Sequence, residues 1–135
     1  PHPENKTFAK KCKKKSICFI QLISPTTSLI RMKQIIKDSH DVVYYISMLS
    51  TTGAVLKVSP KKVLENYNKV KNINKSKNIV IGFGITSKTI GSLKNADGLV
   101  VGSQLCKEIT ISLQKRQNPV TKLSNMVENL KRIIS

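Results

Sequence analysis

The feature that most limits the possible folds is a pair of strand-like segments that lack a polar side. Residues 42–46 read Val-Val-Tyr-Tyr-Ile and residues 79–81 read Ile-Val-Ile, so no position of either segment carries a charge. Successive side chains of a strand point to opposite faces of its sheet, so both segments are expected to be buried on both faces. Such burial is typical of parallel sheets covered by helices, and it predicts an α/β fold.

Strand-like runs of this type occur four times, about 20–35 residues apart, and each precedes a helix-like stretch. A parallel connection needs a crossover of a dozen or more residues, which this spacing supplies. The predicted strands are 17–23, 42–47, 78–82 and 98–101. The predicted helices are 4–15, 28–39, 60–73, 87–94, 104–114 and 120–134, with Ser59 and Ser87 as N-caps and Pro60 in a first turn.

Glycine-rich turns directly follow the last two predicted strands. Gly82-Phe83-Gly84-Ile85 leads into one predicted helix, and Gly102-Ser103 leads into the next. Glycines at strand ends let the backbone approach a ligand closely, and helix N-termini offer free N–H groups to an anion. Complete (β/α)8 barrels place phosphate sites after strands seven and eight, so the two turns together predict a phosphate site.

Four segments of the chain resemble motifs of the tryptophan synthase alpha chain family, and they occur in the family's order. They are Pro-Thr-Thr-Ser at 25–28, Tyr-Tyr-Ile-Ser at 44–47 leading to Thr52-Gly53, the turn at 82–85, and Ala-Asp-Gly-Leu-Val-Val-Gly-Ser at 96–103. A complete barrel needs roughly 250 residues, and this chain has 135 and begins at Pro1 without a methionine. The resemblance therefore implies that residues 1–135 form one partial domain, the C-terminal half of a (β/α)8 TIM barrel, with strands five to eight and their covering helices.

The resemblance also implies an activity. The family cleaves indole-3-glycerol phosphate to indole and glyceraldehyde 3-phosphate in tryptophan biosynthesis, as a lyase without a cofactor or metal, and its partner is the tryptophan synthase beta chain in an α2β2 assembly. Four residues would hold the phosphate, four would line the indole pocket, and one would belong to the loop that closes over the site. By resemblance these are Gly53, Gly84, Gly102 and Ser103 for phosphate, Ile23, Tyr44, Phe83 and Val100 for indole, and Thr52 for loop closure. Of the adjacent Tyr44 and Tyr45, only one can face the barrel interior.

The family's two catalytic carboxylates lie on the second strand and the loop after it, and so outside this chain. Seven acidic residues are present, and Asp41 and Asp97 precede their strands, on the side of a barrel that serves stability. Glu65, Glu108 and Glu128 fall within predicted helices, and Glu4 lies near a helix start. We therefore predict no catalytic residue in this chain and no lyase activity of the chain alone. The closing loop also departs from the family, with Ser50 where a glycine is usual and Met48 where several members carry arginine.

Two alternatives to this family stay open, and the first comes from the net charge of +17. A basic nucleic-acid-binding domain is one, although only three of the 24 basic residues are arginine and aromatic side chains are few. Another phosphate-binding TIM barrel with similar glycine turns is the second.

No apolar run approaches the roughly 18 residues of a membrane span. The odd number of cysteines, Cys12, Cys18 and Cys106, contains no Cys-x-x-Cys pair and favours a cytoplasmic protein without metal sites or disulfides.

Overall fold

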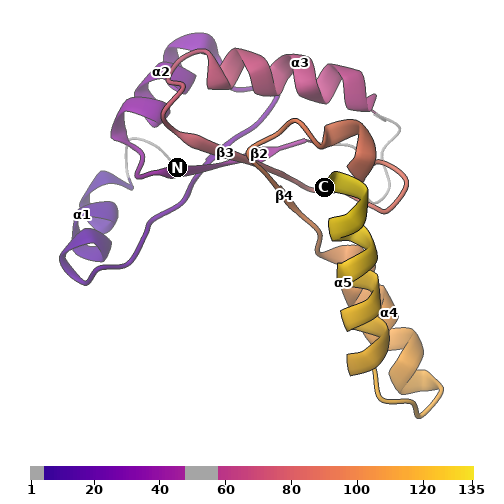
Figure 1. Ribbon diagram of the computed structural model, residues 1–135. Helices are drawn as coiled ribbons and strands as arrows, with labels where there is room; N and C mark the ends of the chain where they lie inside the picture. Colours follow the sequence, from indigo (N-terminus) through magenta and orange to yellow (C-terminus); the bar gives the residue numbers. More distant parts are fainter. Residues whose placement is uncertain (1–4, 48–57) are drawn as a thin grey trace.

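The computed structural model describes residues 5–47 and 58–135 of the chain (Figure 1). Four strands form one parallel sheet in the order in which they occur along the chain. They are β1 (Gln21–Ile23), β2 (Val42–Ile46), β3 (Asn78–Gly82) and β4 (Gly98–Val100). The predicted α/β fold with about four parallel strands is confirmed.

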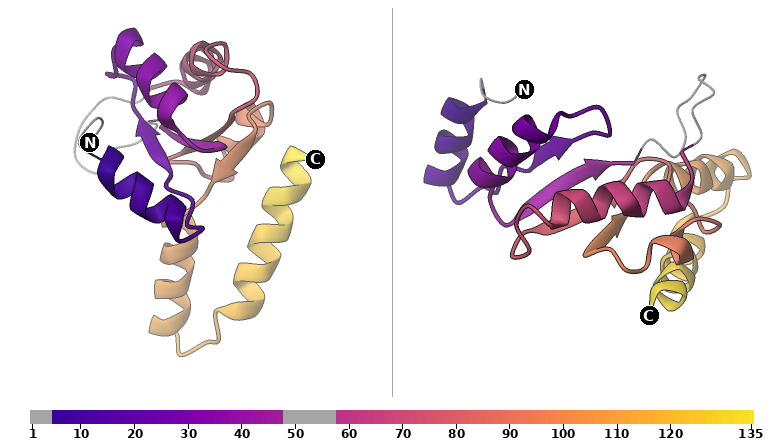
Figure 2. Two further views of the ribbon diagram at one scale, coloured as in Figure 1. Left: turned by 90° about the vertical axis from the view of Figure 1, so that its left-hand side faces the viewer. Right: turned by 90° about the horizontal axis from the view of Figure 1, so that it is seen from above.

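Five α-helices and one 3₁₀ helix accompany the strands in the described part of the chain. They are α1 (Lys6–Lys14), α2 (Leu29–Asp38), α3 (Pro60–Lys71), η1 (Ile90–Leu93), α4 (Ser103–Gln114) and α5 (Val120–Ile134). In Figure 1, α2 and α3 lie on the same side of the sheet, whereas α1 and the α4–α5 pair lie at its opposite ends. Helices α4 and α5 pack against each other as an antiparallel pair (Figure 2). None of the helices in these ranges is long and apolar enough to cross a membrane.

Most predicted boundaries agree with the structure, and the largest difference lies at residues 87–94. Helix α3 begins as predicted, because the Ser59 hydroxyl accepts a hydrogen bond from the Lys62 N–H (3.3 Å) and Pro60 occupies its first turn. The predicted α-helix at 87–94 is wrong, since only η1 forms there and Thr89 is its N-cap residue. The prediction of Ser87 as an N-cap is also wrong, because its hydroxyl accepts a hydrogen bond from the side chain of Gln104 in α4.

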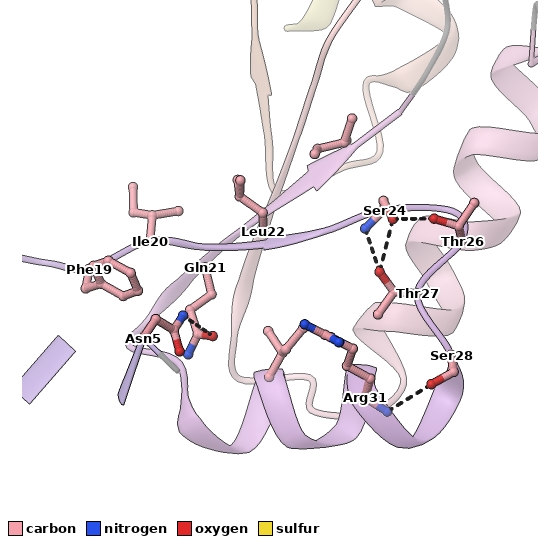
Figure 3. Close-up of a pocket in the computed structure, with 12 residues that line it drawn as sticks. Asn5, Phe19, Ile20, Gln21, Leu22, Ser24, Thr26, Thr27, Ser28 and Arg31 are labelled. Atoms are coloured by element: carbon pink, nitrogen blue, oxygen red, sulfur yellow. Dashed lines mark hydrogen bonds between the residues drawn. The ribbon is translucent and has the colours of Figure 1, made fainter. Parts of the chain in front are cut away.

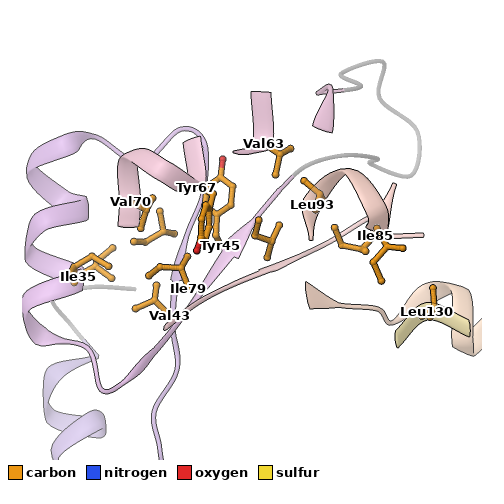
Figure 4. Packing of buried hydrophobic residues seen from close by; sticks show 14 residues of the cluster. Ile35, Val43, Tyr45, Val63, Tyr67, Val70, Ile79, Ile85, Leu93 and Leu130 are labelled. Atoms are coloured by element: carbon orange, nitrogen blue, oxygen red, sulfur yellow. The ribbon is translucent and has the colours of Figure 1, made fainter. Parts of the chain in front are cut away.

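One face of the sheet packs against the helices and forms the core (Figure 4). Ile23, Tyr45 and Ile81 are in register on neighbouring strands, and all three are fully buried there. The helices contribute apolar side chains to the same cluster, which are Ile35 and Ile36 from α2 and Val63, Tyr67 and Val70 from α3. Burial of this apolar surface is the main stabilising contribution to the folded chain.

The opposite face of the sheet is more open than the helix-covered face. Leu22, Tyr44 and Val80 are in register on this face, and the side chain of Leu22 is 58% exposed. The prediction that residues 42–46 and 79–81 are buried on both faces is therefore confirmed only for the helix-covered face. On the other face, Val42, Tyr44, Ile46 and Val80 are partly exposed. Strand β1 is also shorter than predicted. Only Gln21, Leu22 and Ile23 pair with β2, and residues 17–20 precede this paired part.

Candidate functional site

The two glycine-rich turns lie side by side at the carboxyl end of the sheet. Gly82 of β3 is in register with Val100 of β4, and these are the last paired residues of the two strands. Gly84 and Gly102 each follow two positions later in the chain. Because parallel strands end at the same edge, the structure brings Gly84 and Gly102 together with Ser103, as the sequence predicts.

The first turn has an uncommon backbone conformation. Phe83 (φ 78°) and Gly84 (φ 77°) both adopt the left-handed region, which glycine tolerates and a bulky residue such as phenylalanine rarely adopts. Ile85, which follows, is buried in the core and anchors the turn. A strained phenylalanine held between two glycines is typical of a functional turn.

A buried serine contacts this turn, and sequence reasoning missed it. Ser47 directly follows β2 and is fully buried. Its hydroxyl donates toward the carbonyl oxygens of Gly82 (2.8 Å) and Phe83 (2.5 Å), and its N–H donates to the Gly82 carbonyl (2.9 Å). Ser47 ends the Tyr-Tyr-Ile-Ser segment that carries part of the resemblance, but the sequence gives it no role, because its partners lie 35 and 36 residues away.

The second turn presents the start of a helix to the same edge. Helix α4 begins at Ser103, and its N-cap residue Gly102 provides no side-chain cap. The first N–H groups of a helix have no partner within the helix, and together with the helix dipole they favour an anion. A Cβ atom at Gly102 would have no neighbour within 4 Å, so the space in front of this helix end is open among the described residues.

Two side chains join the turns. The Ser87 N–H donates to Gln104 Oε1 (2.9 Å), and Gln104 Nε2 donates to the Ser87 hydroxyl (3.3 Å). Gln104 belongs to the first turn of α4, whereas Ser87 follows the Phe83–Gly84 turn, so the pair holds the start of α4 against the other turn. The sequence gives no signal for this pair, because the two residues are 17 positions apart.

The residues predicted for the indole pocket do not all lie on one face. Tyr44 lies on the open face beside Gly82, where its phenol occupies the position of a hypothetical Gly82 side chain. Phe83 (49% exposed) and Val100 (40% exposed) are partly accessible at the end of the sheet. Ile23 lies instead in the helix-covered core, in register with Tyr45. Of the predicted set, Tyr44, Phe83 and Val100 are therefore brought to one region, and Ile23 is not.

Six of the residues discussed from the sequence lie outside the described ranges. They are Pro1, Glu4, Met48, Ser50, Thr52 and Gly53. The predicted roles of Gly53 in phosphate binding and of Thr52 in loop closure stay predictions.

The carboxylate of Asp97 lies at the end of the sheet opposite the two glycine turns. Asp97 precedes β4 and accepts hydrogen bonds from the Ile79 N–H (2.7 Å) and Lys71 Nζ (2.8 Å), so it joins the amino ends of β3 and β4 to α3. Burial acts to raise the pKa of Asp97, but the hydrogen bond from Ile79 and the Lys71 ammonium outweigh it and hold that pKa below its usual value. Asp97 is therefore a structural carboxylate.

A cavity of about 730 Å³ lies elsewhere, along the unpaired edge of β1 (Figure 3). Its lining includes Leu22, Ser24 and Arg31 and none of the residues predicted to hold phosphate. The Ser24 hydroxyl bonds to the hydroxyls of Thr26 and Thr27, and the Ser24 N–H also donates to the Thr27 hydroxyl. An unpaired edge presents backbone groups to a further strand, and no described strand lies beside this edge of β1, which explains the cavity.

Comparison with known proteins identifies the family. The family model described as tryptophan synthase alpha chain matches residues 1–135. The chain belongs to the tryptophan synthase alpha chain family. The tryptophan synthase alpha chain of Pelagibacter ubique (strain HTCC1062) is 73% identical over 135 residues, which are all of this chain and 51% of that protein. The tryptophan synthase alpha chain of Bacillus velezensis is 34% identical over 130 residues, or 95% of this chain and 48% of that protein.

Solved structures of this family have the same fold. Tryptophan synthase subunit alpha from Legionella pneumophila str. Paris superposes with a TM-score of 0.81 at 25% identity, covering 97% of this chain and 47% of that one. The tryptophan synthase complex from Pyrococcus furiosus matches with a TM-score of 0.76 at 27% identity, covering 96% and 50%. This alpha chain sequence thus spans about half the length of the relatives it matches, and its four strands correspond to half of a TIM barrel.

Proposed function

We propose that this chain is the substrate-holding half of a tryptophan synthase alpha chain. In the full-length form, the enzyme would cleave indole-3-glycerol phosphate to indole and glyceraldehyde 3-phosphate. The backbone at Gly84, Gly102 and Ser103 would bind the phosphate, with Gly53 as a further contributor. Tyr44, Phe83 and Val100 would contact the indole ring, and Thr52 would act in loop closure. Ile23 is left out of this proposal because it is fully buried in the core on the helix-covered face.

The observation that carries this proposal is the position of the two glycine turns. Gly84 and Gly102 each lie two residues after a member of the pair Gly82 and Val100, and α4 begins at the same edge of the sheet. A phosphate ion binds well where several backbone N–H groups converge at the start of a helix. Apolar side chains beside such a site suit the other end of a substrate that combines an indole ring with a phosphate.

The chain alone would bind without catalysing. Cleavage of the C–C bond requires a proton donor and a proton acceptor at the reacting atoms. Asp41 precedes β2 and Asp97 precedes β4, so both lie at the amino ends of the strands, opposite the glycine turns. The carboxylates would therefore come from the half of the alpha chain that lies outside this sequence.

The partner is proposed from the relatives. The solved structure from Pyrococcus furiosus is named as a tryptophan synthase complex. We propose that the full-length form of this chain likewise assembles with a tryptophan synthase beta chain, in the cytoplasm and without a cofactor in the alpha chain.

A chimera tests the proposal directly. In it, this chain replaces the matching half of the alpha chain from Pelagibacter ubique, which is 73% identical. We expect the chimera to release indole from indole-3-glycerol phosphate and to bind glycerol 3-phosphate. The 135-residue chain without the other half should show no turnover.

Two results would count against this assignment. Turnover by the 135-residue chain alone would show that it contains its own proton donor and acceptor. A folded chimera that binds no glycerol 3-phosphate would show that the glycine turns do not form a phosphate site. A Gly84→Val chimera tests the same site, because a branched side chain at φ 77° should disturb this turn and reduce phosphate affinity.

A further inference from the structure

Ser47 makes a set of hydrogen bonds that fixes one peptide group of the candidate phosphate site. Its hydroxyl reaches both the Gly82 and the Phe83 carbonyl oxygens, and the shorter contact, 2.5 Å, is to Phe83. The side chain is fully buried, so water does not compete for these bonds. We propose that Ser47 is a positioning residue that orients the Phe83–Gly84 peptide toward the phosphate, an inference that rests on the proposed function of the two turns.

The geometry of the peptide group gives the reason. In a trans peptide, the carbonyl of one residue and the N–H of the next point in opposite directions within one plane. The Phe83 carbonyl points toward Ser47, so the Gly84 N–H points away from it. A phosphate accepts hydrogen bonds, so the N–H is the group of Gly84 that would bind it in the proposed site, and the hydroxyl of Ser47 would thus hold this donor outward.

The conformation of Phe83 makes such support necessary. A non-glycine residue at φ 78° is in a sparsely populated region, which costs about 1–3 kcal/mol and persists only when neighbouring contacts hold it. Rotation of the Gly82–Phe83 peptide changes this φ angle, and it would relieve the strain but displace the Phe83–Gly84 turn. The hydroxyl and the N–H of Ser47 both bond to the Gly82 carbonyl and oppose that rotation.

The main chain of Ser47 also joins β2 to β3. The N–H of Ser47 also bonds to the Gly82 carbonyl (2.9 Å), so the end of β2 and the end of β3 are joined through both main-chain and side-chain groups of one residue. Ser47 therefore extends the pairing of β2 and β3 past their last paired residues, Ile46 and Gly82. The Phe83–Gly84 turn is held at the point where the regular sheet stops.

The test compares Ser47→Ala with Ser112→Ala in the chimera. Ser112 is also fully buried and donates a hydrogen bond, to Glu108 Oε1 (3.3 Å), but it lies within α4 and touches neither turn. We expect Ser47→Ala to weaken glycerol 3-phosphate binding about tenfold, the equivalent of one buried hydrogen bond, and to shift the Gly84 amide resonance. Ser112→Ala should leave both the affinity and that resonance unchanged.

The resonance measurement separates this inference from the proposed function. If the unsubstituted chimera does not bind glycerol 3-phosphate, the proposed function fails, whereas a Gly84 amide shift in Ser47→Ala still supports the positioning role. An unchanged Gly84 resonance and unchanged affinity in Ser47→Ala would overturn the inference. Should Ser47→Ala not fold, Ser47→Cys keeps nearly the same shape with a weaker donor, and the same two readouts apply.

Discussion

The phenol of Tyr44 occupies the space that a side chain at Gly82 would need. A Cβ atom built on Gly82 would overlap the end of the Tyr44 ring. We therefore expect Gly82→Ala to displace Tyr44, to lower the free energy of unfolding by about 1–3 kcal/mol as overpacked sites do, and to weaken indole binding. Chemical denaturation and an indole titration of the chimera would measure the two effects.

Gly102→Ala is the matched control for this change. Nothing lies within 4 Å of a Cβ atom at Gly102, and its φ of −116° is accessible to alanine. The free energy of unfolding should therefore stay within about 0.5 kcal/mol of the unsubstituted value. Equal destabilisation by both alanines would show that Tyr44 does not limit the size of residue 82.

Asp97 gives a prediction about acid stability. Its carboxylate is hydrogen-bonded to Ile79 and Lys71, and its pKa lies below the ordinary value of 3.8. The resulting stabilisation is complete above the unfolded-state pKa and is lost as the pH falls through the lower folded-state pKa. We expect Asp97→Asn to lower the free energy of unfolding by about 1–3 kcal/mol at pH 7, with less difference from the unsubstituted chimera below pH 4.

Glu65→Gln distinguishes this effect from a general loss of charge. The pKa of Glu65 is also lowered, by its hydrogen bond and ion pair with Lys62, but its carboxylate is exposed to solvent. Exposed pairs contribute little to stability, so Glu65→Gln should leave the denaturation midpoint unchanged at both pH values. An Asp97→Asn variant that behaves like Glu65→Gln would contradict the structural role of Asp97.

Helix α3 shows how a local sequence signal determines where a helix begins. Ser59 caps the helix, and its first turn contains no acidic residue. Ser59→Ala should lower the free energy of unfolding by about 1 kcal/mol, because one helix N–H loses its acceptor. Ser59→Asp keeps an acceptor and adds a negative charge at the positive end of the helix dipole, so it should be at least as stable as the unsubstituted chimera. Thermal unfolding of the two variants checks this, and equal losses would exclude a capping role.

Elements with local signals could be predicted from the sequence, and those set by distant partners could not. The apolar run at 42–46 and the Ser59-Pro60 start of α3 agree with the structure. Residues 87–94 were expected to be helical, but Thr86 and Thr89 bond to each other and only η1 follows. The length of β1 depends on where β2 begins, which the residues of β1 do not encode.

The same division holds for the candidate site. Glycines after two adjacent parallel strands sufficed to predict that Gly84 and Gly102 lie together, since strand order alone brings them to one edge. The placement of Ile23 depends on which face its position reaches once β1 pairs with β2, and the motif does not contain this register. The hydrogen bonds of Ser47 and the Ser87–Gln104 pair arise only in the folded chain.

At the scale of the whole molecule, the uncovered sheet face predicts how the chain behaves without its other half. Leu22 (58% exposed) lies on an apolar face beside the unpaired edge of β1, and such surfaces promote association. The net charge of +17 opposes association through repulsion, which salt screens. We therefore expect the 135-residue chain to gain apparent mass in light scattering as protein concentration and salt increase, whereas the chimera should not.

Two exposed leucines provide the internal comparison for this prediction. Leu22 lies on the open face, and Leu113 is similarly exposed (62%) but belongs to α4. Leu22→Ser should lower the apparent mass of the 135-residue chain at high salt, because it places a hydroxyl on the face that associates, and Leu113→Ser should have little effect. If both substitutions act alike, general surface hydrophobicity drives association. If neither does and the chain stays monomeric at all salt concentrations, the open sheet face is not an association surface.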